Sequence, residues 1–248
     1  MSAKILLIDI ETFPNLYYAW RLWEGHALDI REFSSVCCFS AKWLGGKQVT
    51  KALPDFNGSE KELTRALWEL VNEADVLVAH NGRAFDFGRI NSQFIKFGFP
   101  PPSPTKKVDT KRMATRVFGF DSNSLDNLCQ FLKLGKKMAT GGYELWQQCM
   151  DNDPKAWARM KKYNEHDVVL LEKLYLTLRS WSAEHPNLNL YSEGECCPKC
   201  GGPADKIQSR GTYRAETRSY RRFQCRTCMG WLKENQSIKG IRAKYVSV

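Results

Sequence analysis

Two acidic residues near the N-terminus, Asp9 and Glu11, have a spacing that brings two carboxylates to one place. They follow the apolar run at residues 5–8, whose β-branched ends predict a strand buried on both faces. Residues i and i+2 of a strand point to the same side, so both carboxylates face one spot. Their mutual repulsion is relieved by a divalent cation that prefers oxygen ligands, such as Mg²⁺ or Mn²⁺. The alternative is a strand that ends in a solvated acidic turn.

Two further acids, Asp86 and Asp167, lie next to predicted buried segments. Asp86 follows a short apolar strand at residues 76–79 and begins a predicted helix, where a carboxylate is also stabilised simply by the helix N-terminus. Asp167 lies four residues after Tyr163, so the two side chains share one helix face. Leucines at helical spacing mark that face as packed into the core. Asp167 therefore needs a partner, either a cation or a lysine or arginine.

The elements that must position these acids follow from hydrophobic periodicity and capping signals. Further strands are predicted at residues 33–44 and 49–53, with a hairpin turn at Gly45 and Gly46 between them. Predicted helices begin after the capping box at Ser59, at about residue 87, and after Asp153. Hairpin strands followed by alternating helices and strands predict a mixed α/β sheet flanked by helices.

Four cysteines near the C-terminus form a second group with metal-binding spacing. Cys197 and Cys200 make one Cys-x2-Cys pair, and Cys225 and Cys228 make another after 24 intervening residues. Thiolate pairs at this spacing bind one tetrahedral Zn²⁺, although the adjacent Cys196 could replace Cys197. Four thiolates close the metal site, so the ion would be structural. We expect a zinc-ribbon β domain over residues 193–248, after a first domain over residues 1–192.

The positive charge of the chain is concentrated in its last fifth. Residues 196–248 contain 12 Lys and Arg and 3 Asp and Glu, a net charge of +9, whereas residues 1–195 have a net charge of +1. This asymmetry predicts a surface that binds a polyanion. The expected nucleic-acid contacts are Arg214, Arg218, Arg221 and Arg222, which alternate with aromatic residues that can stack on bases. The alternative is a solvated hairpin with an aromatic inner face.

Composition narrows the class of protein further. The mean hydropathy is −0.46, and no stretch approaches the roughly 20 apolar residues of a membrane span. The N-terminus has no signal-like apolar region. We therefore expect a soluble, cytoplasmic protein with no membrane partner. Nine cysteines in such a protein indicate thiols or metal ligands rather than disulfides.

Three short motifs together resemble those of the DEDD superfamily of 3′-to-5′ exonucleases. They are Asp9-x-Glu11-Thr12, Asn81-x3-Phe85-Asp86 and Tyr163-x3-Asp167. The tyrosine subgroup, which includes the proofreading domain of family B DNA polymerases, is most similar, and residues 125–137 also resemble a segment of those domains. The resemblance covers about residues 4–181. It implies a ribonuclease-H-like fold, in agreement with the element order above.

The resemblance also implies roles for individual residues around two Mg²⁺ or Mn²⁺ ions. Asp9 would bridge both ions, Glu11 and Asp167 would complete the site that activates water, and Asp86 would help to hold the second ion. Tyr163 would orient the attacking water. Thr12 and Asn81 are candidate substrate contacts, although Asn81 could instead satisfy backbone groups at the end of the strand. The other subgroup uses a histidine five positions before the last Asp. Lys162 occupies that position here, so we interpret His166 as a flanking residue.

One other family with paired acids after a first strand is excluded by spacing. Phosphatases of the haloacid dehalogenase type have the pattern Asp-x-Asp-x-Thr/Val. Here the second acid is Glu11, and the residue two positions later is Phe13.

The sequence thus predicts a two-metal 3′-to-5′ exonuclease acting on nucleic acid, with DNA favoured over RNA. Its substrate would be single-stranded DNA or the 3′ end of a duplex, and the ribbon would hold substrate or a replication or repair protein. One alternative is a non-catalytic module that binds nucleic acid or a replication complex, but the presence of all four acids and Tyr163 argues against it. Another alternative is a structure-specific endonuclease on the same fold.

Overall fold

The computed structural model describes residues 2–21, 23, 26–240 and 243, and it contains two compact units. The larger unit is Lys4–Tyr175, and the smaller consists mainly of Leu176–Val248. The boundary between the units falls inside the long helix α6 (Pro154–Leu178). The sequence-based division after residue 192 stays a prediction. Among the described residues, no helix has the length and apolar character that a membrane crossing requires.

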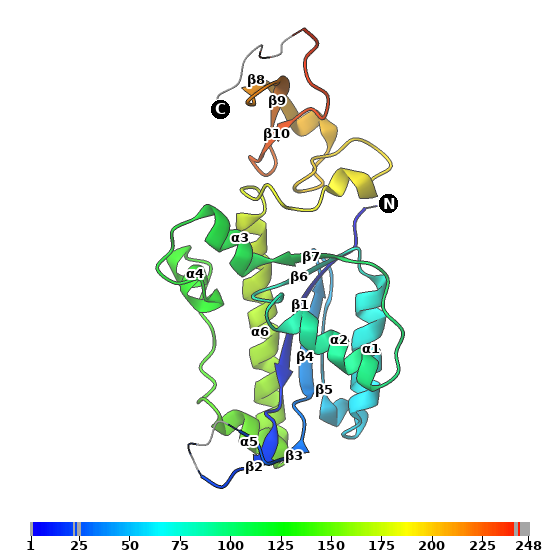
Figure 1. Ribbon diagram of the computed structural model, residues 1–248, viewed down its shortest axis with the longest axis vertical. Helices are drawn as coiled ribbons and strands as arrows, with labels where there is room; N and C mark the ends of the chain where they lie inside the picture. Colours follow the sequence, from blue (N-terminus) through cyan, green and yellow to red (C-terminus); the bar gives the residue numbers. More distant parts are fainter. Residues whose placement is uncertain (1, 22, 24–25, 241–242, 244–248) are drawn as a thin grey trace. The chain divides into compact units, whose positions relative to one another are not determined.

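The larger unit is built on a mixed sheet with the order β5-β4-β1-β6-β7 (Figure 1). The strands are β1 (Ile5–Thr12), β4 (Val36–Trp43), β5 (Gln48–Ala52), β6 (Val76–Ala79) and β7 (Lys106–Asp109). β1 is central, antiparallel to β4 and parallel to β6. Its first four residues are buried, as expected for an apolar strand covered on both faces. The mixed α/β fold predicted from the sequence is confirmed.

Helices cover both faces of this sheet, and the alternation of β1 decides where its acids point. The helices α1 (Glu60–Glu73) and α2 (Asp86–Lys96) pack in one core cluster with Leu6, Ile8 and Ile10. The odd-numbered residues of β1 therefore face the other side, which α6 covers (Figure 1). Asp9 and Glu11 belong to this set, so the strand directs both acids towards α6.

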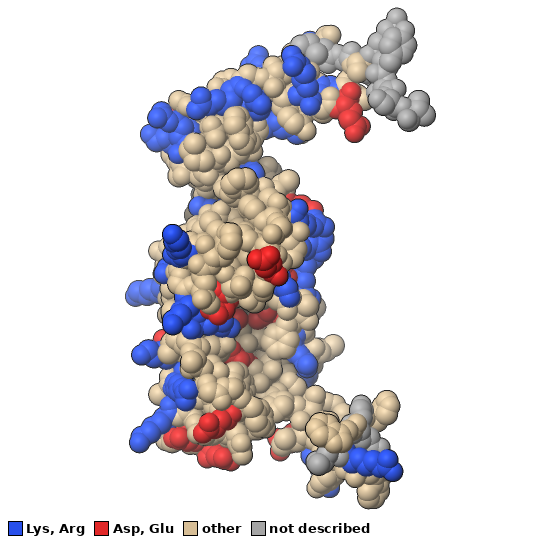
Figure 2. Space-filling view, turned by 90° about the vertical axis from the view of Figure 1, so that its left-hand side faces the viewer, with Lys and Arg blue, Asp and Glu red and all other residues tan. Residues whose placement is uncertain are grey.

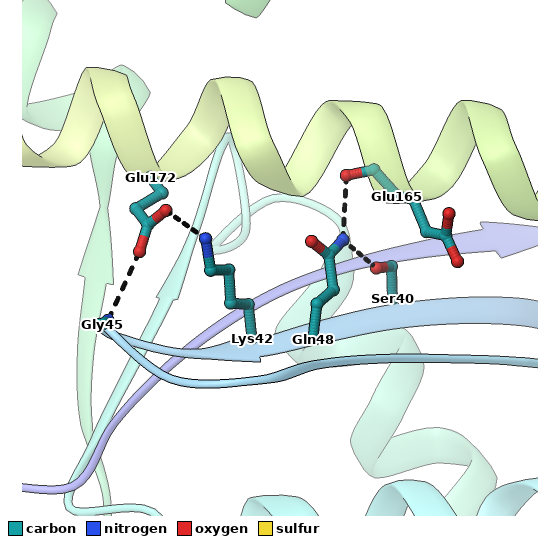
Figure 3. Close-up of polar contacts among 6 residues, drawn as sticks. All are labelled: Ser40, Lys42, Gly45, Gln48, Glu165 and Glu172. Atoms are coloured by element: carbon teal, nitrogen blue, oxygen red, sulfur yellow. Dashed lines mark hydrogen bonds and ion pairs between the residues drawn. The ribbon is translucent and has the colours of Figure 1, made fainter.

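Polar contacts hold α6 against the β4–β5 hairpin (Figure 3). The Gln48 side chain donates a hydrogen bond to the backbone carbonyl of Glu165, with an N···O distance of 2.9 Å. Two turns further on, the Lys42 ammonium lies 2.5 Å from the Glu172 carboxylate, and both side chains are largely buried. These contacts lie on either side of Asp167 along the helix. They restrict the rotation of α6 about its axis and so fix the direction in which Asp167 points.

Further helices and a hairpin complete the larger unit. The helices are α3 (Thr110–Val117), α4 (Leu125–Phe131) and α5 (Glu144–Met150). A two-stranded hairpin of β2 (Leu16–Tyr18) and β3 (Asp29–Glu32) follows β1, and the residues of both strands are exposed. This hairpin was not predicted, because its strands have no buried face to produce an alternating pattern.

The smaller unit contains a three-stranded antiparallel sheet with the order β10-β9-β8. The strands are β8 (Ile207–Arg214), β9 (Ser219–Cys225) and β10 (Trp231–Lys233). The central strand β9 buries its two end residues, Ser219 and Cys225. A cysteine cluster and a small sheet are therefore both present where the sequence predicts a ribbon.

Candidate active site

Three of the predicted acids meet between β1 and α6. One carboxylate oxygen from each of Asp9, Glu11 and Asp167 lies within 4.8 Å of the others. Asp86, at the first position of α2, is buried and accepts a hydrogen bond from the backbone N–H of Ile10, with an N···O distance of 3.4 Å. The fourth acid thus contacts β1 at the residue between Asp9 and Glu11. The structure brings all four predicted acids into one region.

Burial and mutual repulsion disfavour the charged forms of these acids. Burial raises the pKa of Asp9 well above its usual value, and the charges of Asp86, Glu11 and Asp167 raise it further. Burial, with the charge of Asp167, raises the pKa of Glu11 to about 8. Burial likewise raises the pKa of Asp86 to about 7. A divalent cation among these oxygens would offset the repulsion and hold the acids in their anionic form.

Asp167 combines one paired and one unpaired side-chain oxygen. Its Oδ2 lies 2.6 Å from the Lys137 ammonium, whereas within the described part of the chain the buried Oδ1 has no hydrogen-bond partner. A buried acceptor left unsatisfied costs free energy of about 1–3 kcal/mol. Coordination of a cation by Oδ1 would remove that cost. The donor set, which is all carboxylate oxygen, suits Mg²⁺ or Mn²⁺.

Tyr163 lies beside this acid and keeps its phenolic proton. Burial, together with the charge of Asp167, raises the pKa of Tyr163 above its ordinary value. The Lys137 ammonium lies 5.0 Å from the centre of the Tyr163 ring. Tyr163 is therefore available as a hydrogen-bond donor at neutral pH.

Asn164 and Lys137 are site residues that the sequence reasoning missed. The amide of Asn164 donates a hydrogen bond to Asp9 Oδ2, with an N···O distance of 2.6 Å, and the side chain is fully buried. Asn164 lies three residues before Asp167, so both project from the same face of α6. That spacing is the one local signal that could have identified Asn164. Lys137 lies 30 residues from Asp167 in the chain, and the sequence marked it only as the last residue of the segment 125–137 that resembles the exonuclease domains.

The turn before α2 is held by its own hydrogen bonds. Asn81, a predicted substrate contact, has a left-handed backbone with φ of 63°, and its N–H donates to Asp109 Oδ1 at 3.0 Å. Asp109 also accepts hydrogen bonds from the first N–H groups of α3 and caps that helix. The ring of His80 is bonded to the Thr110 hydroxyl and the Asn123 carbonyl, and burial lowers its pKa to about 4. These contacts account for the turn without a ligand.

The remaining predicted residues of the larger unit lie at the edges of the site. Thr12 follows Glu11 in β1. It lines a pocket of about 500 Å³ whose walls include Arg89 and Trp146. The Trp146 ring makes an edge contact with Tyr163, with 6.3 Å between ring centres. On the face of this unit in Figure 2, acidic side chains lie in a hollow with Lys and Arg on both sides. His166 bonds the Lys136 carbonyl at 2.8 Å.

The four predicted zinc ligands also come together. The Sγ atoms of Cys197, Cys200, Cys225 and Cys228 lie within 4.8 Å of one another, with Cys197–Cys228 and Cys200–Cys225 separations of 3.8 Å. A tetrahedron with Zn–S distances of about 2.3 Å requires S···S separations of about 3.8 Å, so the cluster has the dimensions of a zinc site. Cys196 instead forms a β-bridge with Pro203 and is not in the cluster.

The four arginines predicted to contact nucleic acid have different contacts and exposures in the structure. The guanidinium of Arg222 donates two hydrogen bonds to the Arg210 carbonyl. Arg221 lies 3.8 Å from the Glu234 carboxylate. Arg214, at the end of β8, and Arg218, in the turn before β9, are exposed.

Comparisons with known proteins agree with this architecture. A profile of the RNase_H superfamily matches residues 24–179. The DNA polymerase III PolC-type of Ureaplasma parvum serovar 3 is 28% identical over 150 residues, which are 52% of this chain and 10% of that protein. A structure of the family B DNA polymerase from the hyperthermophilic archaeon Pyrobaculum calidifontis superimposes with a TM-score of 0.53 and 18% identity. The superposition covers 72% of this chain and 25% of the polymerase, and it shows a shared fold.

Proposed function

The chain belongs to the RNase_H superfamily, and we propose that it is a metal-dependent 3′-to-5′ exonuclease of nucleic acid, with DNA as the favoured substrate. The observation that carries the proposal is the convergence of Asp9, Glu11 and Asp167, with Asp86 hydrogen-bonded to the same strand. Tyr163, one helical turn before Asp167, supports membership of the tyrosine subgroup of DEDD exonucleases. The similarities to DNA polymerases support a substrate that is a DNA strand end.

The acids fit two divalent cations. Asp9, Glu11 and Asp167 would hold one ion, and Asp9 and Asp86 would hold the other, directly or through water. The unpaired oxygen of Asp167 and the closeness of the Asp9, Glu11 and Asp167 carboxylates are the features that favour cation binding. Such a pair of ions, when bound, stabilises the attacking and leaving oxygens of an in-line displacement at phosphorus.

The protein's own side chains would orient the reacting groups. Tyr163, which keeps its proton, would position the attacking water through its hydroxyl. The Lys137 ammonium neutralises part of the charge on Asp167 and holds its Oδ2, which leaves Oδ1 as the unpaired oxygen. Asn164 holds Asp9 in place through a buried hydrogen bond. In metalloenzymes, loss of a residue that hydrogen-bonds to a metal ligand typically lowers metal affinity or activity by about 10- to 100-fold.

We further propose that the smaller unit is a zinc ribbon that retains the substrate. Its four thiolates would hold a structural Zn²⁺, and two glycines leave the room that the cluster needs. A Cβ at Gly202 or Gly230 would lie 3.2 Å from the sulfur of Cys200 or Cys228, respectively. The net charge of +9 over residues 196–248 supports a nucleic-acid ligand, and a replication or repair protein is the other candidate partner.

Digestion of end-labelled nucleic acids tests the reaction. We expect 5′-labelled single-stranded DNA to give a ladder of shortening products in Mg²⁺ or Mn²⁺, and a blocked 3′ end to prevent it. Parallel digests of duplex DNA and of RNA define the substrate. Internal cleavage of a substrate with blocked ends would instead identify an endonuclease. Binding of every substrate without any cleavage would favour the non-catalytic module.

The same assay tests the site. Asp9→Ala and Asp167→Ala each remove an anion from the cluster, and we expect each to lower the cleavage rate roughly 10³-fold. Substrate binding should largely remain, because neither acid attracts a polyanion. Asp121→Ala, which removes an exposed acid outside the site, is the matched control and should cleave at the normal rate. Near-normal cleavage by either site variant would refute the assignment of these acids.

A further inference from the structure

One face of the three-stranded sheet in the smaller unit gathers aromatic and cationic side chains. Tyr213 of β8 pairs with Tyr220 of β9, and Lys233 of β10 pairs with Arg222 of β9. Residues that pair across strands share a face, and so do residues i and i+2 of one strand. Because Arg222 is two residues after Tyr220 and Trp231 is two before Lys233, all five side chains project from the same side. We call these five residues the aromatic face.

Contacts within the aromatic face place each cation over a ring. The Arg222 guanidinium lies 4.9 Å from the centre of the Trp231 ring. The Lys233 ammonium lies 4.0 Å from the centre of the Tyr220 ring and 5.7 Å from that of Tyr213. Trp231 and Tyr213 nevertheless remain 51% and 44% exposed. The rings are thus held in place while part of each remains open to solvent.

The opposite face of the sheet is buried at both ends of β9 but open at Arg221, whose side chain is 69% exposed. Ser219 and Cys225 on that side of β9 are buried, and Cys225 belongs to the cysteine cluster. Arg221 also lies on that side, where it meets the carboxylate of Glu234. The exposed rings of the sheet, Tyr213 and Trp231, therefore lie on the aromatic face. This division separates Arg222 from Arg221, although the two are adjacent in sequence.

We propose that the aromatic face binds single-stranded nucleic acid, with bases stacked on Trp231 and Tyr213 and phosphates next to Arg222 and Lys233. Base stacking on protein rings requires unpaired bases, because a duplex hides the flat faces of its bases. The charge of the segment complements a polyanion. The inference deepens the proposed function, on which it rests for its biological role, by naming the class of strand that the ribbon holds.

Equilibrium binding of fluorescein-labelled oligonucleotides tests the inference. The full chain carries Asp9→Ala, so that the probe is not digested, and single-stranded DNA, single-stranded RNA and duplex DNA of one sequence are compared. We expect Trp231→Ala to weaken single-strand binding roughly 10-fold and Trp231→Phe, which keeps a ring, to weaken it less. Lys233→Ala should flatten the salt dependence by about 0.7 in log–log slope. Arg226→Ala, which removes an exposed charge just after β9 and outside the aromatic face, is the matched charge control.

The outcomes separate this inference from the proposed function. Unchanged binding by both Trp231→Ala and Lys233→Ala, or an equal loss in Arg226→Ala, would overturn the aromatic face as the site. Tighter binding of duplex than of single strand would overturn it as well. Zinc content and a thermal melt of each variant show whether a loss of binding reflects unfolding. If Trp231→Ala unfolds, the exposed Lys233→Ala still tests the inference. A wild-type protein that binds through this face but cleaves nothing would refute only the exonuclease.

Discussion

At the scale of single residues, the two carboxylate oxygens of Asp167 have different surroundings. Lys137 holds one at 2.6 Å, and the other is buried without a partner in the part of the chain described. A buried acceptor without a partner costs free energy, and a cation ligand would remove that cost. Asp167 therefore has the lysine partner that the sequence left open as an alternative, and its second oxygen remains available to the cation that we propose.

Tyr163 and His166 compete, on sequence alone, for a direct role near the attacking water. Tyr163→Phe removes only a hydroxyl, and we expect it to slow hydrolysis by about 10- to 100-fold, because a mispositioned nucleophile costs that much. His166→Ala should change the rate by about twofold at most, since its ring bonds the Lys136 carbonyl on the flank of the site. Single-turnover rates at saturating Mn²⁺ check both. The reverse ranking would place the protein outside the tyrosine subgroup.

The site residues that could be predicted from the sequence depend on local spacing, whereas those that were missed depend on contacts between distant parts of the chain. Asp9 with Glu11, and Tyr163 with Asp167, follow from spacings of two and four residues, which depend only on local geometry. Asn164 reaches Asp9 across 155 positions of sequence. The local sequence pattern does not indicate this contact, because the contact forms only when α6 packs against β1. Polar partners of catalytic acids are for this reason the hardest part of a site to predict.

At the scale of elements, the turn between β6 and α2 determines where Asp86 begins its helix. Gly82 lies in this turn without room for a side chain, since a Cβ there would meet the Ala79 Cβ at 2.6 Å and the Phe87 ring at 2.8 Å. Real Cβ atoms do not approach that closely, so the turn or the helix would have to move. The close packing of Gly82 thus couples the end of β6 to the position of Asp86.

Gly82→Ala should lower the free energy of unfolding by about 1–3 kcal/mol through this clash. Gly88→Ala is the matched control in α2, where nothing lies within 4 Å of the added Cβ. A helical alanine should there raise the free energy of unfolding by about 0.5–1 kcal/mol. Urea unfolding of both variants measures the difference. Equal stabilities would show that the turn adapts and does not fix Asp86.

Element prediction succeeded where a buried face repeats and failed where none exists. The strand predicted at residues 33–44 is β4, Val36–Trp43, and the helix predicted after Ser59 is α1, with Leu63, Leu67 and Val71 buried. The β2–β3 hairpin has only exposed residues, so hydrophobic alternation gave no signal for it. The strand order of the main sheet likewise depends on long-range pairing that the sequence pattern does not contain.

At the scale of the whole molecule, acids and positive charge are distributed to different parts of the chain. The catalytic candidates all precede residue 168, whereas nearly the whole net charge follows residue 195. Deep acids would repel a polyanion unless cations neutralise them, and a separate basic unit would raise the local concentration of substrate without altering the acids. The division predicts that cleavage and retention of substrate can be separated by truncation.

Truncation after Glu195 removes the +9 segment and the cysteine cluster but none of the four acids. Because a closed Zn(Cys)₄ site adds two negative charges, the effective loss is nearer +7. If the segment neutralises roughly three to five phosphates, the slope of log binding constant against log salt should flatten by about 0.7 for each. The truncated enzyme should therefore cleave at a normal rate at saturating substrate and bind more weakly, most clearly at low salt. A thermal melt establishes that it is folded, and a folded truncation with an unchanged salt slope would mean that the ribbon docks a protein instead of a nucleic acid.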